Sequence, residues 1–267
     1  LERRGLGPDD LDAVIACTVT PDFMFPTTAA LITHKIGATR AYGFDLNGAC
    51  SGFLYGLTTA CGLVASGAVR RVAVVGCEVM SSIINREDRN TAVLFGDGAG
   101  AALIEPVEEG YGVLDFEQRV NAVGQDLLKM PAGGSVLPAS HETVDRRLHV
   151  VHQQGQEVYK HAVREMSEFS RLMVERNGLQ KEDIHLLVPH QANIRIMEAV
   201  AKRLELSESQ VASNIADYAN TTAATIPTAI HQSLEAGRIR KGDHLVITAF
   251  GAGFTYGAAL MRWAVDG

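Results

Sequence analysis

The chain has 267 residues, 46% of them hydrophobic, with a formal net charge of −7 and a pI of about 5.7. This length can bury a large core, either as one domain or as two related halves. The acidic balance and the absence of a basic run argue against a nucleic-acid partner. No apolar stretch approaches the roughly 20 residues that a membrane helix needs.

Four short apolar runs predict buried strands at residues 12–16, 72–76, 184–188 and 244–250. Longer helical patterns separate them, such as the one over residues 155–178. Strands that alternate with helices and are apolar on both faces indicate an α/β fold with a mostly parallel sheet. Two glycine-rich turns precede further strands, FGDGAGAALIE (95–105) and FGAGFTYG (250–257), and the second predicts a hairpin.

Two parts of the chain repeat one pattern. The segment GACSGFLYGLTTACGLVASGAVRR (48–71) aligns without a gap with YANTTAATIPTAIHQSLEAGRIRK (218–241). Any two α/β units share some of this pattern, but the order, spacing and glycine caps favour a duplicated unit. We predict one half over residues 1–140 and a second over 141–267, and we expect the opening βα unit of the first half to lie before Leu1.

Cys50 is a candidate nucleophile, and the alignment of the two halves places it opposite Asn220. It lies among small residues in DLNGACSGF (45–53), immediately before an apolar helix. Unpaired amides at a helix start favour a thiolate and can also hold an oxyanion. The alternative is a buried small apolar residue, which is the favoured interpretation for the other three cysteines. The four cysteines form no CxxC pair, and we expect reduced thiols in the cytoplasm.

Two further motifs contain candidate polar groups. In VPHQANIRI (188–196), His190 follows a predicted strand, at the end where α/β sheets place ligands. In YANTTAATIP (218–227), Asn220 precedes a Thr- and Ala-rich turn, and considered alone it is better explained as a helix N-cap. The sequence contains no HExxH, Walker P-loop or EF-hand motif, so we expect neither a metal site nor a bound cofactor.

Four motifs carry a resemblance to a known family: in chain order they are DLNGACSGF, VPHQANIRI, NTTAATIP and FGAGFTYG. Together they resemble the β-ketoacyl-[acyl-carrier-protein] synthase III family over essentially the whole chain. The resemblance implies a thiolase-like α/β fold, in which two duplicated βα halves with mixed, mostly parallel sheets form five layers, and a homodimer. It also implies an acyltransferase of fatty-acid chain initiation. Such an enzyme condenses an acyl-CoA primer, here expected to be acetyl-CoA, with malonyl-[acyl-carrier-protein] to give a 3-oxoacyl-[acyl-carrier-protein].

By position, the resemblance also implies roles for individual residues. Cys50 takes the acyl group, and His190 and Asn220 bind the malonyl thioester oxygen and stabilise the enolate formed as carbon dioxide leaves. The amides of Cys50 and Ala252 form the oxyanion hole. The implied acyl pocket is Phe25, which reaches the partner subunit, with Phe95 and Phe250; the CoA entrance is Arg89 and Asn193; carrier protein binds at Gln191, Ala192, Asn193, Ile194 and Arg195.

Other functions fit parts of this pattern. A secondary-metabolite acyltransferase or a polyketide-type condensing enzyme uses the same Cys, His and Asn set. A non-catalytic partner subunit usually lacks the cysteine, which is present here as Cys50. A Cys/His/Asn hydrolase would need water at the thioester. HQAN followed by Arg195 favours an enzyme that uses a carrier protein.

Overall fold

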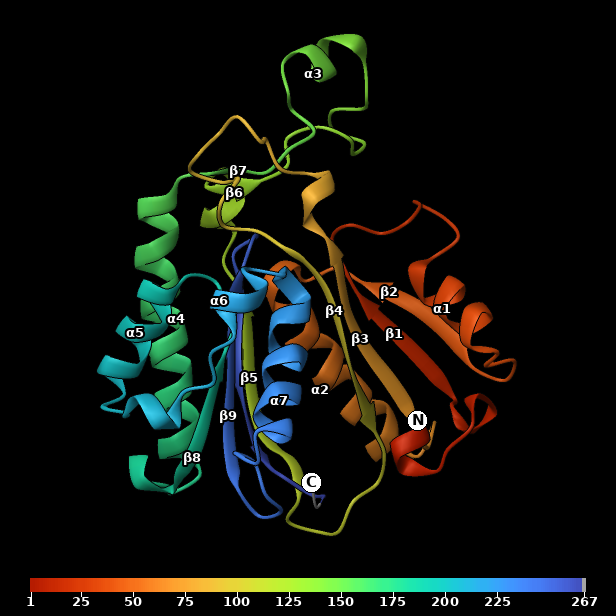
Figure 1. The fold of residues 1–267 in the computed structure, drawn as a ribbon, viewed down its shortest axis with the longest axis vertical. Helices are drawn as coiled ribbons and strands as arrows, with labels where there is room; N and C mark the ends of the chain where they lie inside the picture. The colour runs from red at the N-terminus through yellow and green to blue at the C-terminus, as the bar shows by residue number, and fades with distance from the viewer. Residues whose placement is uncertain (266–267) are drawn as a thin grey trace.

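Two four-stranded sheets form the framework of the computed structural model, which describes residues 1–265 (Figure 1). The first sheet has the order β2-β1-β3-β4 and the second β5-β10-β9-β8. The strands of the first sheet are β1 (Ala13–Cys17), β2 (Tyr42–Leu46), β3 (Val72–Val79) and β4 (Asp97–Ile104). Those of the second are β5 (Gly112–Val120), β8 (Ile184–Pro189), β9 (His244–Gly251) and β10 (Thr255–Arg262).

Helices separate the two sheets and cover their outer faces (Figure 1). The middle layer is formed by α2 (Gly52–Ala65) and α7 (Thr225–Glu235), and α1 (Thr28–Ile36) covers the first sheet. The second sheet is covered by α4 (Gly155–Arg176) and α5 (Ile194–Arg203). This order of helix, sheet, helices, sheet and helices confirms the expected five layers.

The smaller elements lie mostly in the connections. A short ribbon pairs β6 (Leu128–Lys129) with β7 (His152–Gln153), and α3 (His141–Asp145) lies in the projecting loop at the top of Figure 1. Other short helical turns include α6 (Ile215–Tyr218) and the 3-10 turns η3 (Ala49–Ser51) and η8 (Thr222–Ala224), which lead into α2 and α7. Every helix within residues 1–265 is too short or too polar to span a lipid bilayer.

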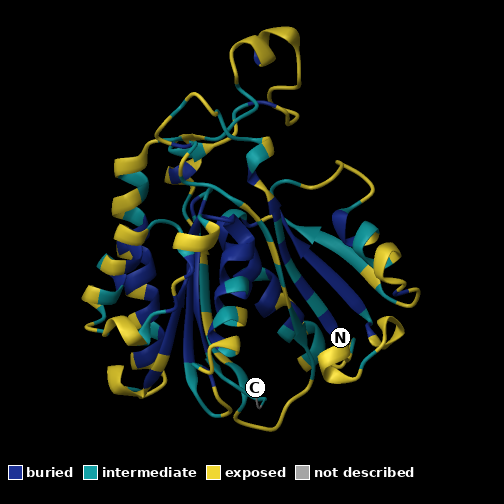
Figure 2. Cartoon of the chain, viewed as in Figure 1, coloured by how far each residue is buried: buried dark blue, intermediate teal, exposed yellow. Residues whose placement is uncertain are grey.

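The first turns of the middle-layer helices and the central strands beside them are deeply buried (Figure 2). In α2, Phe53, Leu54 and Leu57 are all exposed by 1% or less, because sheets lie on both sides of this apolar helix. All five residues of β1 are buried as well, as expected for a strand with both faces covered. The helix starts that carry the candidate residues are therefore held by a rigid core.

The four predicted strands correspond to β1, β3, β8 and β9, and the predicted hairpin is β9–β10. Sequence analysis did not predict β5, whose polar residues hide its pairing with β10. Because β5 joins the second sheet, the two sheets divide between Ile104 and Gly112, earlier than the expected boundary at 140/141. The sheets are mixed, as expected, and parallel pairings make up three of the six strand pairings.

The internal repeat is also visible in the backbone. Ala49 and Ala219, which the ungapped alignment pairs, have positive φ angles of 48° and 57°. Left-handed backbone is unfavourable for a residue with a Cβ, so it persists only where the surroundings impose it. Each of these alanines immediately precedes a candidate residue, Cys50 or Asn220. A positive φ at both aligned positions supports a duplicated unit.

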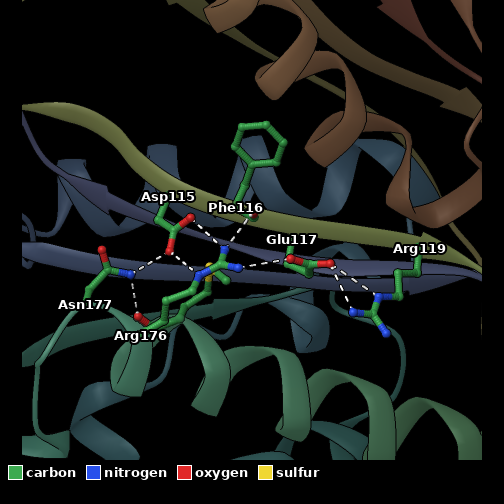
Figure 3. Close-up of polar contacts among 7 residues, drawn as sticks. Asp115, Phe116, Glu117, Arg119, Arg176 and Asn177 are labelled. Atoms are coloured by element: carbon green, nitrogen blue, oxygen red, sulfur yellow. Dashed lines mark hydrogen bonds and ion pairs between the residues drawn. The ribbon is translucent and has the colours of Figure 1, made fainter.

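A polar network fastens the end of α4 to the edge strand β5 (Figure 3). The Arg176 guanidinium donates from Nε and Nη2 to the Asp115 carboxylate at 2.7 and 2.6 Å, and from Nη1 to Glu117 at 3.0 Å. Asn177 donates to the same Asp115 carboxylate at 2.7 Å. The hydrogen bond from Arg176 lowers the pKa of Asp115. This fork-shaped pairing fixes the outer helix against β5.

Candidate active site

Cys50 lies in η3, at the entrance to α2, and is 8% exposed. Contacts from the other half hold this turn. Thr255 donates through its hydroxyl to the Gly48 carbonyl oxygen at 2.8 Å, and Ser51 donates to the Thr255 carbonyl oxygen at 3.1 Å. Gly251, at the end of β9, packs against the Cys50 amide. The β9–β10 hairpin therefore positions the candidate nucleophile.

The Cys50 side chain is a thiol at neutral pH. Burial raises its pKa to about 12, and the nearby Glu78 carboxylate contributes to the rise. The Thr222 hydroxyl and the Cys50 amide act in the opposite direction but do not offset burial. The expectation that the helix start favours a thiolate is therefore wrong for the resting protein, and transfer of an acyl group to Cys50 requires a proton acceptor.

His190 follows β8 and is 1% exposed. Its backbone N–H donates to the Thr248 carbonyl oxygen at 2.8 Å, which continues the pairing of β8 with β9. The ring nitrogen Nδ1 lies 2.7 Å from the Thr225 hydroxyl at the start of α7. Burial lowers the pKa of His190 to about 3, so its ring is neutral at physiological pH and can accept a proton.

Asn220 is held by a short parallel bridge to Phe95. The Asn220 N–H donates to the Leu94 carbonyl oxygen at 2.9 Å, and its side-chain Oδ1 accepts from the Thr222 N–H at 2.9 Å. These bonds orient the amide so that Nδ2 points toward the Ala192 carbonyl oxygen, at 3.4 Å. An N–H of Asn220 is thus available for an incoming oxygen. Asn220 can therefore cap the following turn through Oδ1 and also serve as a site residue through Nδ2.

The three candidate catalytic residues meet at the turn formed by residues 220–225. The turn η3, which carries Cys50, packs against η8 (Thr222–Ala224) within this segment, and His190 contacts the segment through Thr225. Asn220 begins the turn and reaches the segment after His190 through Ala192. The structure therefore gathers a thiol, a neutral imidazole and an amide N–H in one buried place.

Sequence analysis missed a buried carboxylate behind this site. Glu78, at the end of β3, is 4% exposed and accepts from the Thr20 hydroxyl at 2.6 Å, from Thr18 at 3.2 Å and from the Val19 N–H at 3.1 Å. Burial raises its pKa, while the Thr20 hydrogen bond opposes that rise. The sequence signal that could have identified Glu78 is a glutamate at the end of an apolar strand, where α/β sheets place ligands.

The residues expected to shape the acyl pocket lie in different environments. Phe95 borders the site through its bridge to Asn220, whereas Phe25 is 86% exposed. Phe250 packs in the cluster under α4, with its ring 4.7 Å from that of Phe254. Successive side chains of β9 point to opposite faces of the sheet. Because Gly251 faces Cys50, the side chain of Phe250 points the other way. Ala252 is the next residue and begins the hairpin turn.

The carrier-binding segment divides between buried and exposed residues. Gln191 is fully buried, donates to the Pro189 carbonyl oxygen at 2.7 Å and accepts from the Asn214 N–H at 3.0 Å. Its side chain therefore does not bind a carrier protein, and that expectation is corrected. Asn193 caps α5 by accepting from the Arg195 N–H at 2.9 Å. Ala192 is half-buried, and Ile194 and Arg195 are exposed, as is Arg89 in a separate loop.

A basic groove between α4 and α5 was also missed. It encloses about 510 Å³ and is lined by Tyr159, Lys160, Val163, Ala199, Lys202 and Arg203. Arg195, Ala199 and Lys202 follow one another at helical spacing, so they share one face of α5. The cations are separated in sequence, and only the packing of α4 on α5 brings them together.

Comparisons with known proteins agree with this arrangement. The family model described as 3-oxoacyl-[acyl-carrier-protein (ACP)] synthase III matches residues 44–122, and its C-terminal counterpart matches residues 174–263. A β-ketoacyl-[acyl-carrier-protein] synthase III from Solibacter usitatus is 51% identical and is aligned over 99% of this chain and 81% of the relative.

Solved structures give the same result. A β-ketoacyl-[acyl-carrier-protein] synthase III from Thermus thermophilus superposes with a TM-score of 0.90 at 42% identity, covering 99% of this chain and 81% of that one. A priming β-ketosynthase from the R1128 polyketide pathway has a TM-score of 0.90 at 32% identity, covering 100% and 79%. The fold, the grouped motifs and these matches show that the chain belongs to the β-ketoacyl-[acyl-carrier-protein] synthase III family.

Proposed function

We propose that this chain is an acyltransferase that condenses an acyl-CoA primer, expected to be acetyl-CoA, with malonyl-[acyl-carrier-protein]. The product is a 3-oxoacyl-[acyl-carrier-protein], the first condensation product of a fatty acid. The observation that carries the proposal is the convergence of Cys50, His190 and Asn220 on one buried turn. Membership in the family supports the reaction class. The reaction proposed uses acyl-CoA as a substrate and requires no other cofactor.

In the first half-reaction, the Cys50 sulfur attacks the acyl carbon of acyl-CoA, and the CoA sulfur leaves. The oxyanion of this step is stabilised by the amides of Cys50 and Ala252. In the second half-reaction, Asn220 and His190 donate hydrogen bonds to the malonyl thioester oxygen while carbon dioxide leaves. The resulting enolate carbon attacks the acyl-Cys50 thioester. The orientation of the Asn220 amide, fixed by the Thr222 N–H, supports its donor role.

We propose that acyl carrier protein docks at the basic groove and at Arg195. Carrier proteins of this kind are acidic, whereas the whole chain has a net charge of −7. A local patch of cations can attract an acidic carrier despite this net charge. The acidic groups that lie more than about 8 Å from the patch are largely screened at physiological ionic strength. Lys202 and Arg203 supply that patch on the helix that follows His190, and Lys160, which also pairs with Glu157, adjoins them from α4. We propose that Arg89 and Asn193 line the CoA entrance.

We also propose a cytoplasmic homodimer. Phe23, Met24 and Phe25 are 58%, 84% and 86% exposed, an apolar loop that a second copy would cover. This supports the expectation that Phe25 reaches into the partner subunit. β2 is an edge strand of its sheet, which offers a second element for the same contact. The cysteines of the described chain are free thiols, as is usual in a reducing compartment.

A polyketide-type priming enzyme is the second candidate, because the R1128 priming β-ketosynthase covers the whole chain. Both candidates acylate Cys50, and they differ in the carrier and primer that they accept. The test is to incubate the protein with labelled acetyl-CoA, map the label, and then add malonyl carrier protein. A labelled Cys50 that is discharged into a 3-oxoacyl carrier protein supports the proposal. Labelling without discharge by a fatty-acid carrier favours the second candidate, and hydrolysis alone indicates a thioesterase.

A further inference from the structure

We propose that the Thr225 hydroxyl is a positioning group that selects which nitrogen of His190 carries the proton in each half-reaction. The inference rests on the function proposed above and deepens it. It starts from a chain of three groups, in which His190 Nδ1 lies 2.7 Å from Thr225 Oγ1 and Thr225 Oγ1 lies 2.8 Å from the Thr222 carbonyl oxygen. Thr225 and His190 are each 1% exposed, so bulk water does not compete for these bonds.

The Thr225 hydroxyl has one proton and two neighbours. If it donates to the Thr222 carbonyl oxygen, it must accept from His190, so the proton lies on Nδ1 and Nε2 has a free lone pair. If it donates to Nδ1 instead, the His190 proton lies on Nε2. Rotation of one hydroxyl therefore interchanges a ring that accepts at Nε2 with a ring that donates there. The Thr222 carbonyl oxygen also accepts from the Thr225 N–H, so it stays paired in both states.

Counting hydrogen bonds identifies the resting state. With the proton on Nδ1, two bonds form, from His190 to Thr225 and from Thr225 to Thr222. With the proton on Nε2, only the bond from Thr225 to Nδ1 remains within residues 1–265. The state with the proton on Nδ1 therefore makes one more hydrogen bond inside the protein. Burial lowers the pKa of His190 to about 3, so the ring is neutral and this choice between its nitrogens is real.

The resting state suits transfer of the acyl group to Cys50. The Cys50 thiol needs a base, since its pKa is raised to about 12. The S–H bond breaks as its proton moves to His190 Nε2, the sulfur bonds to the acyl carbon, and the bond from that carbon to the CoA sulfur breaks. The proton then passes from Nε2 to the CoA sulfur, and His190 returns to its neutral state. Thr225 accepts from Nδ1–H throughout.

The alternative state suits decarboxylation. A malonyl thioester oxygen beside His190 gives Nε2–H an acceptor that no residue within 1–265 provides. The number of hydrogen bonds in the two states then becomes equal, and rotation of the Thr225 hydroxyl lets His190 donate to the developing enolate. One threonine thus allows a single neutral histidine to serve two steps that need opposite hydrogen-bonding roles.

Nitrogen-15 NMR of the wild-type protein labelled at histidine tests the resting state without any variant. The nine histidines are assigned by difference, with His190→Gln removing one pair of resonances. We expect the His190 pair to show a protonated Nδ1 and an unprotonated Nε2. A protonated Nε2 in the substrate-free protein would overturn the inference. In Thr225→Val, which keeps the shape and removes the hydroxyl, we expect this preference to be lost.

The kinetic test measures both half-reactions in Thr225→Val, Thr225→Ser and Thr228→Val. We expect Thr225→Val to slow acylation of Cys50 by about tenfold to a hundredfold, the usual effect of leaving a buried donor unpaired. Decarboxylation of malonyl carrier protein should fall less, so the ratio of the two rates should change. Thr225→Ser should restore acylation. Thr228→Val is the matched control, because it removes a hydroxyl one turn along α7 that contacts the Ala224 and Thr225 carbonyl oxygens and the Asn214 side chain but not His190.

The outcomes separate this inference from the function that it deepens. Equal acylation rates in Thr225→Val and the wild type, or equal losses in both half-reactions, would overturn the role of Thr225. If Thr225→Val does not fold, Thr225→Ala replaces it, and the wild-type NMR result stands alone. Failure of the wild type to acylate Cys50 with any acyl-CoA would overturn the proposed function, while the NMR measurement would still report the tautomer.

Discussion

Gly251 lies against the backbone amide of Cys50, so closely that a Cβ there would sit 2.6 Å from the Cys50 nitrogen and 3.1 Å from that of Ser51. Real Cβ atoms do not approach backbone nitrogen to that distance. Gly251 ends β9 in the second sheet, whereas Cys50 lies in the turn η3, which leads into α2. The geometry of the proposed nucleophile therefore depends on a residue some 200 positions away, and on its having no side chain.

Gly251→Ala should displace the Cys50 turn and abolish most of its acylation. We expect a loss of about 10²-fold or more, because misplacing a reacting group by about 1 Å has effects of that size. The measurement is the rate at which acetyl-CoA acylates Cys50, followed by peptide mass. Gly62→Ala is the matched control, since a Cβ on this glycine of α2 meets nothing within 4 Å. Acylation of Gly251→Ala at the wild-type rate would refute the argument.

Cys50 should be the residue that carries the acyl group. Cys50→Ala should remove all stable label from acetyl-CoA, because the acyl group needs a thiol at the start of α2. Cys61→Ala and Cys77→Ala should be labelled normally, although both thiols are more exposed than Cys50. Peptide mapping of the labelled protein distinguishes the three. Label on Cys61 or Cys77, or label that survives Cys50→Ala, would contradict the prediction.

Much of this arrangement was predictable from the sequence, and the remainder depends on packing. Periodicity identified the main strands, and the spaced motifs identified Cys50, His190 and Asn220, because small-residue turns at helix and strand ends are local features. The role of Gln191 was not predictable, since its burial results from bonds to Pro189 and Asn214 across the loop. Likewise, the state of the Cys50 thiol depends on burial, which outweighs the local effect of the helix start.

The pH dependence of Cys50 alkylation should reflect a raised pKa. Below the thiol pKa, the thiolate fraction rises tenfold for each pH unit, so the alkylation rate should keep rising from pH 7 to pH 10. An exposed thiol would instead level off near its ordinary pKa of about 8.5. The experiment follows a small uncharged alkylating reagent by peptide mass, with a short cysteine peptide as the comparison, because burial raises the pKa of Cys61 to about 11 as well. A plateau for Cys50 below pH 7 would indicate a thiolate–imidazolium pair and would contradict a value of about 12.

Protein stability should fall in acid because His190 is buried in its neutral form. Its pKa is about 3 in the folded chain and about 6.5 in the unfolded chain, so the unfolded state binds more protons between these values. The stabilisation is present above pH 6.5 and is lost as the pH falls toward 3, at up to about 1.4 kcal/mol per pH unit. His190→Gln should flatten this part of the curve in denaturant titrations. An unchanged slope would mean that His190 becomes protonated without unfolding.

Asn220 should serve decarboxylation more than acylation. Asn220→Asp keeps an oxygen that accepts from the Thr222 N–H, but it removes the N–H that the malonyl thioester oxygen needs. We expect malonyl decarboxylation to fall by about 10²–10³-fold, the usual loss for one oxyanion donor, and self-acylation to fall less. The two rates are measured separately, from release of carbon dioxide and from labelled Cys50. Equal losses in both would mean that Asn220 mainly supports the nucleophile turn.

Arg195 and Lys202 should control the encounter with the carrier protein. Both lie on the face of α5 that borders the basic groove, and a charge at the rim of an interface mainly changes the association rate and its salt dependence. Arg195→Glu and Lys202→Glu should raise the KM for malonyl carrier protein and leave acetyl-CoA acylation nearly intact. Arg195→Ala should have the smaller effect, because it removes a charge without reversing it.

The control for these variants must change the charge by the same amount elsewhere. Arg240→Glu does so, because Arg240 is exposed and precedes the start of β9, at the end of that strand opposite Gly251. Added salt should weaken the wild-type reaction and should narrow its difference from Arg195→Glu, since exposed charges are screened over about 8 Å at physiological ionic strength. If Arg195→Glu and Arg240→Glu give the same KM and the same salt dependence, the carrier protein docks on another face.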